Sequence, residues 1–462
     1  MSHQNAPGQA QPLNLVVPGA FSGREGPSEE SLAREWVAIH GERWRFDHAA
    51  GKWFQWTGER WQRDECSRAV HLVGEHLRAA AGGEKPRPSI ASRRTASGVE
   101  AFARANPVVA TTHCIWDADL LLLGTPGGTV DLKTGKLRPA APAEHITKLT
   151  AVAPATGRPA RWLTFLEEST GEDAETITFL QQWCGYCLTG ETREHALAFV
   201  YGPGGNGKSV FLNTVTAILS DYAVTAAMET FTASRSDRHS TELAMLQGAR
   251  LVTASETDQG RGWAEAKIKA LTGGDPITAR FMRMDNFTFQ PHFKLMIAGN
   301  FAPSLRNVDE AMRRRLNIIP FTRTPATPDR QLETKLRDEW PMILQWMIEG
   351  CALWQGTGLK RPDAVTVATN AYFTDQDLFG QWLEDRCILD PTNQNWETPD
   401  PLFQSWRDYA AGAGEQPGKR TDFKVGLERR GIMAGKTGGL RIYRGVKLRP
   451  QGHGDGGTHG AA

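Results

Sequence analysis

The chain has 462 residues, with 53 Lys and Arg against 52 Asp and Glu and a formal net charge of +1. This length suggests roughly three domains with sizeable cores. The balanced charge argues neither for nor against nucleic acid, so any basic surface must be local. No apolar run approaches the ~20 residues that cross a bilayer, the start lacks a secretory layout, and six cysteines do not suggest a disulfide framework. We expect a cytoplasmic protein.

The N-terminal part combines a polar tail with an aromatic cluster. Residues 1–30 are rich in Gly, Pro, Ser and Gln, which predicts a disordered tail. Residues 43–61 alternate around a turn and predict a small antiparallel meander. Five tryptophans lie between Trp36 and Trp61. Such a cluster can stack nucleic-acid bases, but the core of a small domain explains it better.

A helical segment at about 161–190 contains Cys184 and Cys187, whose Cys-x-x-Cys spacing occurs in metal and redox sites. No second Cys or His pair stands at zinc-ligand spacing, and apolar residues surround the two cysteines. We interpret them as core residues of a buried helix.

The most specific motif is Gly-Pro-Gly-Gly-Asn-Gly-Lys-Ser, between an apolar run of strand length and a helical segment at 210–219. Glycines let main-chain N–H groups point at a triphosphate. Lys208 then lies on the β- and γ-phosphates, and Ser209 on Mg²⁺. The alternative is a chance glycine-rich turn. The sequence therefore predicts a Walker A loop that binds ATP through Gly202, Pro203, Gly204, Gly205, Asn206, Gly207, Lys208 and Ser209.

Two later apolar strands end in polar residues that suit nucleotide hydrolysis. One ends at Glu256, in the layout of a Walker B motif, where an acid polarises the attacking water or holds Mg²⁺. Ser255 and Asp258 leave open which group assists the metal, and an ordinary polar turn is the alternative. The other strand is followed by Asn300, whose amide can contact the γ-phosphate and the lytic water. A turn-forming Asn is the alternative reading.

A run of three arginines, Arg313 to Arg315, lies between acidic and apolar residues. It can be a solvated face. Alternatively, a guanidinium from this run completes a neighbouring subunit's site and neutralises charge on the transferred phosphoryl group, which requires a ring-shaped oligomer.

A hairpin is predicted from residues 277–283 and 287–289, just before the strand that ends at Asn300. Such a hairpin can project Arg280 or Arg283 into a central pore to grip a nucleic-acid backbone. A purely structural hairpin is the alternative.

The C-terminal region predicts helices at 376–388 and 400–411 and a hairpin-like segment at 439–446. Residues 401–450 hold eleven Lys and Arg against four Asp and Glu, a local excess of +7. Helices followed by a basic hairpin suggest a winged helix. A solvated charged tail is the alternative.

Several stretches, in this order, resemble the superfamily 3 helicases of phage and plasmid primase–helicases and their poxvirus relatives. They are 184–190, 201–209, 254–257, 269–280, 299–300 and 309–321. The resemblance implies an α/β, AAA+-type P-loop ATPase that assembles as a homohexamer and translocates along single-stranded and forked DNA in a bacterial host cell. It also implies ATP and Mg²⁺ as ligands.

Carried over by position, the resemblance makes Lys208 and Ser209 the phosphate and metal ligands, Glu256 the Walker B acid and Asn300 the sensor. The family's arginine pair falls on Arg314 and Arg315, and which one acts in trans stays open. Contacts to DNA are expected from Lys269, Arg280 and Arg283. The region before the helical collar shows no paired-acid primase site, so a separate primase is an expected partner.

The resulting hypothesis is an ATP-dependent replicative DNA helicase. The alternatives are a DNA-stimulated ATPase that recognises or remodels an origin, and a small-molecule P-loop kinase. The expected segments are a disordered tail (1–30), an N-terminal mixed α/β domain (31–155), a helical collar (156–194), the ATPase domain (195–360), a winged-helix-like domain (370–450) and a second disordered tail (451–462).

Overall fold

The computed structural model describes residues 27–82, 89–233, 240–255, 262–283, 285–305, 309–325, 328–413 and 415–450. They divide into two compact units, with the boundary between Ile115 and Trp116 and with residues 58–60 counted in the second unit. Residues 116–155, which we expected in the N-terminal domain, thus belong to the second unit. The reason is packing, since Leu123, Val130 and Leu132 share a buried cluster with the helices that follow.

The first unit is a small α/β domain built on a four-stranded sheet of order β3-β2-β1-β4. Strands β1 to β3 form the predicted antiparallel meander, and β4 adds in parallel to β1. The five tryptophans from Trp36 to Trp61 are all buried, which confirms their interpretation as core residues. The elements are α1 (Glu29–His40), β1 (Trp44–Asp47), β2 (Lys52–Trp56), β3 (Trp61–Arg63), α2 (Arg68–Ala80), α3 (Arg93–Ala105) and β4 (Ala110–Thr111).

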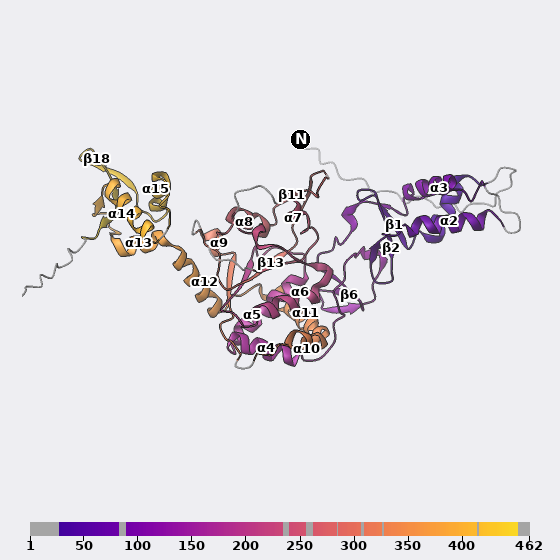
Figure 1. Cartoon of the computed structure of the whole chain (residues 1–462), viewed down its shortest axis with the longest axis horizontal. Helices are drawn as coiled ribbons and strands as arrows, with labels where there is room; N and C mark the ends of the chain where they lie inside the picture. Colours follow the sequence, from indigo (N-terminus) through magenta and orange to yellow (C-terminus); the bar gives the residue numbers. More distant parts are fainter. Residues whose placement is uncertain are drawn as a thin grey trace, which may run out of the picture. The chain divides into compact units, whose positions relative to one another are not determined.

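The second unit begins with a three-stranded antiparallel sheet and a helical layer (Figure 1). The expected collar helix is two helices, because Gly171 adopts the left-handed conformation that ends the first and Asp173 caps the second. Helix α11, which comes later in the chain, packs along α5, the second of these helices. The elements are β5 (Leu122–Thr125), β6 (Gly128–Asp131), β7 (Lys136–Arg138), α4 (Ala160–Thr170), α5 (Ala174–Leu188) and α11 (Trp340–Thr357).

The centre of the second unit is a five-stranded, wholly parallel sheet of order β14-β8-β13-β10-β9. The strands read as apolar runs because both faces are covered. Along β8, Ala198 and Val200 face one buried cluster, while Leu197 and Phe199 face the other. The strands are β8 (Leu197–Tyr201), β9 (Ala223–Thr225), β10 (Leu251–Ser255), β13 (Lys294–Gly299) and β14 (Leu316–Pro320).

Helices and a hairpin surround this sheet. Helix α6 follows β8 after the loop 202–207 and packs on the α5 and α11 side of the sheet. The hairpin of β11 and β12 confirms the predicted one, with register Ile277 to Phe289. The elements are α6 (Lys208–Leu219), α7 (Ser240–Ala244), α8 (Glu265–Gly273), β11 (Ile277–Ala279), β12 (Phe287–Phe289), α9 (Glu310–Arg313), α10 (Leu332–Leu336) and α12 (Asp363–Gln376).

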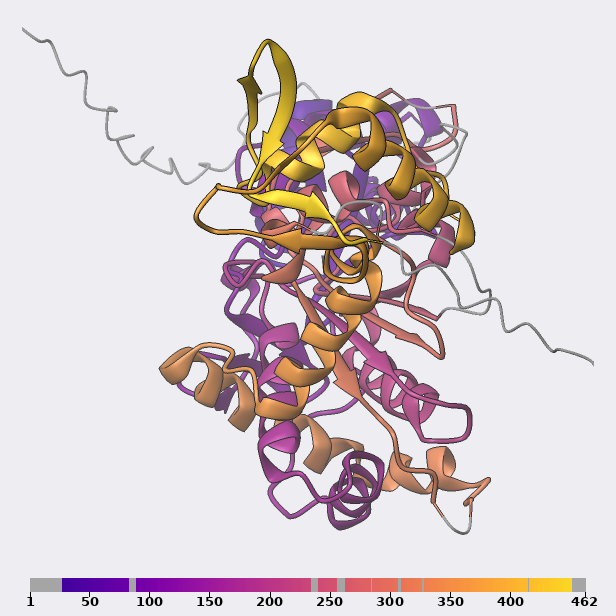
Figure 2. The same ribbon diagram turned by 90° about the vertical axis from the view of Figure 1, so that its left-hand side faces the viewer.

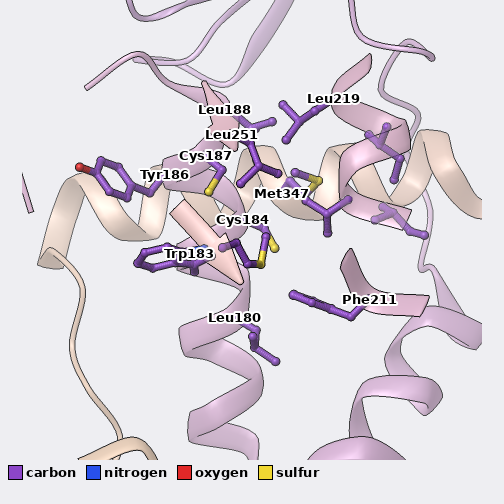
Figure 3. Packing of buried hydrophobic residues seen from close by; sticks show 14 of the residues in the cluster. Leu180, Trp183, Cys184, Tyr186, Cys187, Leu188, Phe211, Leu219, Leu251 and Met347 are labelled. Carbon is purple, nitrogen blue, oxygen red and sulfur yellow. The ribbon is translucent and has the colours of Figure 1, made fainter. Parts of the chain in front are cut away.

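Cys184 and Cys187 are buried in this core, beside Trp183, Phe211 and Met347 (Figure 3). Burial raises the pKa of Cys187 to about 12, so its thiol stays protonated and packs as a small apolar group. Within the described ranges, no group of three His, Cys, Asp or Glu side chains is placed to hold a metal ion.

After α12, which runs on into the C-terminal elements (Figure 2), the chain forms three helices and a set of short strands around their own buried cluster. Strands β16, β18 and β17 form one antiparallel sheet, and β15 pairs with β19. The elements are α13 (Leu378–Arg386), β15 (Cys387–Leu389), β16 (Trp396–Glu397), α14 (Pro399–Gly412), α15 (Arg420–Glu428), β17 (Ala434–Thr437), β18 (Leu440–Arg444) and β19 (Val446–Leu448). None of the helices in the described part of the chain has the length and hydropathy needed to cross a bilayer.

Candidate nucleotide-binding site

The predicted phosphate loop joins the carboxyl end of β8 to the first residue of α6. Gly202 and Gly207 are the positions where only glycine fits. A Cβ on Gly202 would meet the Phe321 carbonyl oxygen at 1.9 Å, and one on Gly207 would meet the Phe165 ring at 2.5 Å. Gly207 also has a φ of +86°, which side chains other than glycine rarely adopt. No side chain caps the N-terminus of α6, so its first N–H groups are available to an anion.

Lys208 lies folded into this loop. Its Nζ donates hydrogen bonds of 2.8 Å to the Gly202 carbonyl, the Pro203 carbonyl and the Asn206 Oδ1. All three partners are neutral oxygens, and burial lowers the pKa of the ammonium. A charge that is desolvated without a carboxylate attracts an anion, because an incoming phosphate supplies the missing counter-charge.

Asn206 holds the loop in place through two side-chain hydrogen bonds. Its side chain is buried, its Oδ1 accepts from Lys208, and its Nδ2 donates to the carbonyl of Phe321, the residue after β14. Asn206 thus orients the lysine and ties the loop to the neighbouring strand. From the sequence we expected a nucleotide contact from Asn206; the structure shows in addition this bracing role, whose partner lies 115 residues away.

The register of the sheet brings the other predicted site positions to the same edge. Tyr201 pairs with Gly299 and with Pro320, and Ala298 pairs with Ser255. The phosphate loop and Asn300 therefore leave the sheet at one level, at the carboxyl ends of the strands, where ligands bind in open α/β sheets. Asn300 is exposed there. Glu256 directly follows Ser255, but Glu256 and Asp258 lie outside the described residues.

The arginine run lies at the opposite edge of the same sheet, which is the edge formed by the amino ends of the strands. The Leu197 N–H donates to the Arg315 carbonyl at 2.8 Å, so Arg315 stands level with the start of β8. A five-residue strand spans about 16 Å, and the phosphate loop begins only where β8 ends. Neither Arg314 nor Arg315 lies at the edge that carries the phosphate loop of its own chain.

The three arginines differ in their surroundings. Arg313 stacks on the Phe373 ring at 5.0 Å and donates to Asn370 Oδ1 at 3.2 Å, both on α12. Arg315 is buried, and its Nη1 donates to the Ala311 carbonyl at 2.9 Å. Burial, followed by the charge of Arg314, lowers the pKa of Arg315. Arg314 is exposed, and it is the arginine best placed to reach a second molecule.

The predicted DNA-binding residues fall into two groups. Arg280 and Arg283 are exposed in the turn region of the β11–β12 hairpin, where Met282 is 76% exposed. Lys269, on α8, forms an ion pair with Asp309, the residue that caps α9. Lys269 is therefore attached to the helix that leads into the arginine run.

The residues present fit ATP and a divalent cation. The glycine cradle, the uncapped start of α6 and Lys208 suit a triphosphate. Ser209 is exposed on the first turn of α6, where its hydroxyl is of the type that Mg²⁺ accepts as a ligand. The cation would neutralise phosphate charge.

Family models and viral proteins match parts of this chain. The family model "D5 N terminal like" matches residues 32–171, and the model "Family of unknown function (DUF5906)" matches residues 200–315. Similar proteins include "Putative helicase L207/L206" of Acanthamoeba polyphaga mimivirus, 27% identical over 245 residues, and "Putative helicase 022R" of Frog virus 3 (isolate Goorha), 28% identical over 247 residues. Each alignment covers 48% of this chain and 25% of the relative. The match thus spans about a quarter of the length of these relatives.

The fold is similar to solved structures of the NrS-1 C-terminal region (305–718). One has a TM-score of 0.53 at 11% identity and covers 91% of this chain and 100% of that one. Another has a TM-score of 0.50 at 12% identity, with 91% and 99% covered. Over about half of its length the chain is thus similar to viral proteins named putative helicases, and its fold is similar to that of the NrS-1 C-terminal region.

Proposed function

We propose that the protein is an ATP-dependent DNA helicase of AAA+ type that hydrolyses ATP between the subunits of a ring and moves along single-stranded DNA. The observation that carries this proposal is the placement of the phosphate loop and the arginines at opposite edges of one parallel sheet. A single copy does not bring both to one site, whereas copies arranged head to tail in a ring do.

The proposed roles follow from chemistry. Lys208 and the N–H groups of the loop bind the phosphates, and Ser209 and Glu256 hold Mg²⁺. Glu256 also polarises the attacking water, and Asn300 senses the γ-phosphate. Arg314 of an adjacent subunit neutralises charge on the transferred group, supported by Arg315. The strand order and the family relationship favour this ATPase over a small-molecule kinase, which needs no second subunit.

The remaining parts would handle DNA. Arg280 and Arg283, on an exposed hairpin, would grip the backbone of one strand by charge, and Lys269 would act indirectly through Asp309. The C-terminal domain has three helices followed by a hairpin, and its basic excess fits a winged-helix-like module that contacts duplex DNA.

A forked DNA substrate tests the proposal. Purified protein with ATP and Mg²⁺ should displace the labelled strand, and Lys208→Ala should lose ATP turnover by about 100-fold or more while keeping its circular dichroism spectrum. DNA-stimulated turnover without displacement would favour an origin-remodelling ATPase. Unchanged turnover in Lys208→Ala would refute the site itself.

A further inference from the structure

Arg361, in the connector between α11 and α12, contacts the backbone that carries the arginine run. Its Nη2 donates to the Arg314 carbonyl at 2.6 Å, and its Nη1 donates to the Arg313 carbonyl at 3.3 Å. Its Nε donates to Asn317 Oδ1 at 2.6 Å. One guanidinium thus reaches the last turn of α9 and the start of β14 together.

Asn317 completes the arrangement. Its side chain is buried, and its Nδ2 donates to the Arg315 carbonyl at 3.1 Å and to the Leu197 carbonyl at 3.2 Å. The carbonyls of all three arginines are therefore held by the pair Arg361 and Asn317. Through Leu197, this pair is anchored to the strand that leads to the phosphate loop.

We infer that Arg361 is a positioning residue for the trans-acting arginine. This inference rests on the proposed function, in which Arg314 reaches the site of an adjacent subunit. By fixing the carbonyls of Arg313 and Arg314, Arg361 sets the direction in which the Arg314 side chain leaves the surface. The planar fork suits this role because its three hydrogen bonds leave from three different nitrogens, which reach acceptors on two elements, whereas all bonds of a lysine ammonium leave from one atom.

The partners of Arg361 explain why a charged side chain, and not an apolar one, suits this position. All three are neutral oxygens, and burial lowers the pKa of the guanidinium. A residue whose role was only to fill space at this position would be apolar. A guanidinium remains because it satisfies main-chain carbonyls at a bend, which an apolar side chain would leave unpaired.

Arg361→Gln should lower kcat for DNA-stimulated ATP hydrolysis by about 100-fold, since displacement of a catalytic group by about 1 Å has that effect. Binding of a fluorescent ATP analogue and the KM for ATP should not change, because the phosphate loop is at the other edge of the sheet. The kcat of Arg361→Lys should lie between those of wild type and Arg361→Gln. Because Arg361→Lys keeps the positive charge, it serves as a second variant if Arg361→Gln fails to fold. The exposed neighbour Lys360 provides the control, and Lys360→Ala should behave as wild type.

The decisive experiment mixes two inactive proteins. Lys208→Ala has no working phosphate loop but an intact arginine run, and Arg361→Gln has the opposite defect. A 1:1 mixture should recover up to about a quarter of wild-type turnover, because that share of randomly formed interfaces pairs the two intact halves. A defect confined to folding or to the site of its own chain would not be rescued.

The mixture of Arg314→Ala with Lys208→Ala separates the two levels of the proposal. If it recovers turnover but the Arg361→Gln mixture does not, the positioning role is overturned and the proposed function stands. If neither mixture recovers turnover, action in trans fails and the positioning role fails with it. Full activity of Arg361→Lys would also overturn the need for a planar fork.

Discussion

Lys294 is a buried cation at the amino end of β13 that the proposed reaction does not use. Its Nζ donates to the Thr189 carbonyl at the end of α5 and lies 4.7 Å from the centre of the Tyr186 ring. Arg250, at the start of the neighbouring strand, donates to the Leu188 carbonyl. Two basic side chains thus bind the carboxyl end of α5, where the helix dipole favours positive charge. They attach the sheet to the helical layer.

The buried position of Lys294 predicts a pH dependence of stability. Burial lowers its pKa to about 7 from the usual 10.5. Between these values the unfolded chain binds more protons, so the free energy of unfolding should rise with pH. From pH 6.5 to 8.5 wild type should gain about 1–2 kcal/mol relative to Lys294→Met. Chemical denaturation of both proteins at the two pH values measures the difference, and parallel behaviour would contradict the assignment.

At the scale of elements, α5 and α11 cross at two glycines. A Cβ on Gly350 would lie 2.0 Å from the Gln181 carbonyl, and one on Gly185 would lie 2.0 Å from the Cys351 nitrogen. The backbones therefore touch, which lets the large side chains around the crossing interlock.

This crossing predicts opposite effects of one substitution at two places in α11. Gly350→Ala should destabilise the protein by about 3 kcal/mol, because the helices must separate. A Cβ on Gly356 would have no atom within 4 Å, so Gly356→Ala should be neutral or stabilising by up to about 1 kcal/mol. Thermal unfolding checks both, and equal effects would show that the glycine crossing is not tight.

The β11–β12 hairpin allows a test of single-stranded DNA binding. Arg283 has a φ of +63°, a conformation that asparagine tolerates well. Arg283→Asn should therefore remove the charge without unfolding the turn and weaken single-strand binding at moderate salt. The slope of log K against log salt should fall by about 0.7 for each phosphate that the hairpin no longer neutralises. A fluorescence anisotropy titration measures this, and an unchanged slope would remove Arg283 from the DNA path.

The sequence predicted elements whose signals are local. The strand, loop and helix around Lys208 and the hairpin around Arg283 each have their pattern within about 20 residues, and the structure contains them. Arg361 gave no such signal, because its partners lie 44 to 48 positions away and are mostly main-chain oxygens. Lys294 was hidden in an apolar strand for the same reason, since Thr189 is 105 positions away. The boundary at 115/116 depended on packing that no local pattern encodes.

At the scale of the whole molecule, the proposed ring makes Arg314 matter only to a neighbour. Arg314→Ala titrated into wild-type protein should reduce turnover more steeply than the wild-type fraction falls, because each altered subunit disables a site that it does not itself contain. Lys360→Ala titrated in the same way should leave turnover unchanged. A strictly proportional loss with Arg314→Ala would argue for action within one chain.

The separation of the phosphate loop and the arginines across the sheet also has a consequence for ATP hydrolysis by unassembled protein. On the proposed function, an isolated copy would bind ATP but lack the second half of the catalytic centre, so it should not hydrolyse ATP. Turnover per chain should then drop sharply on dilution below the concentration at which copies associate. Such a dependence would restrict ATP hydrolysis to copies that have already assembled, for example on DNA.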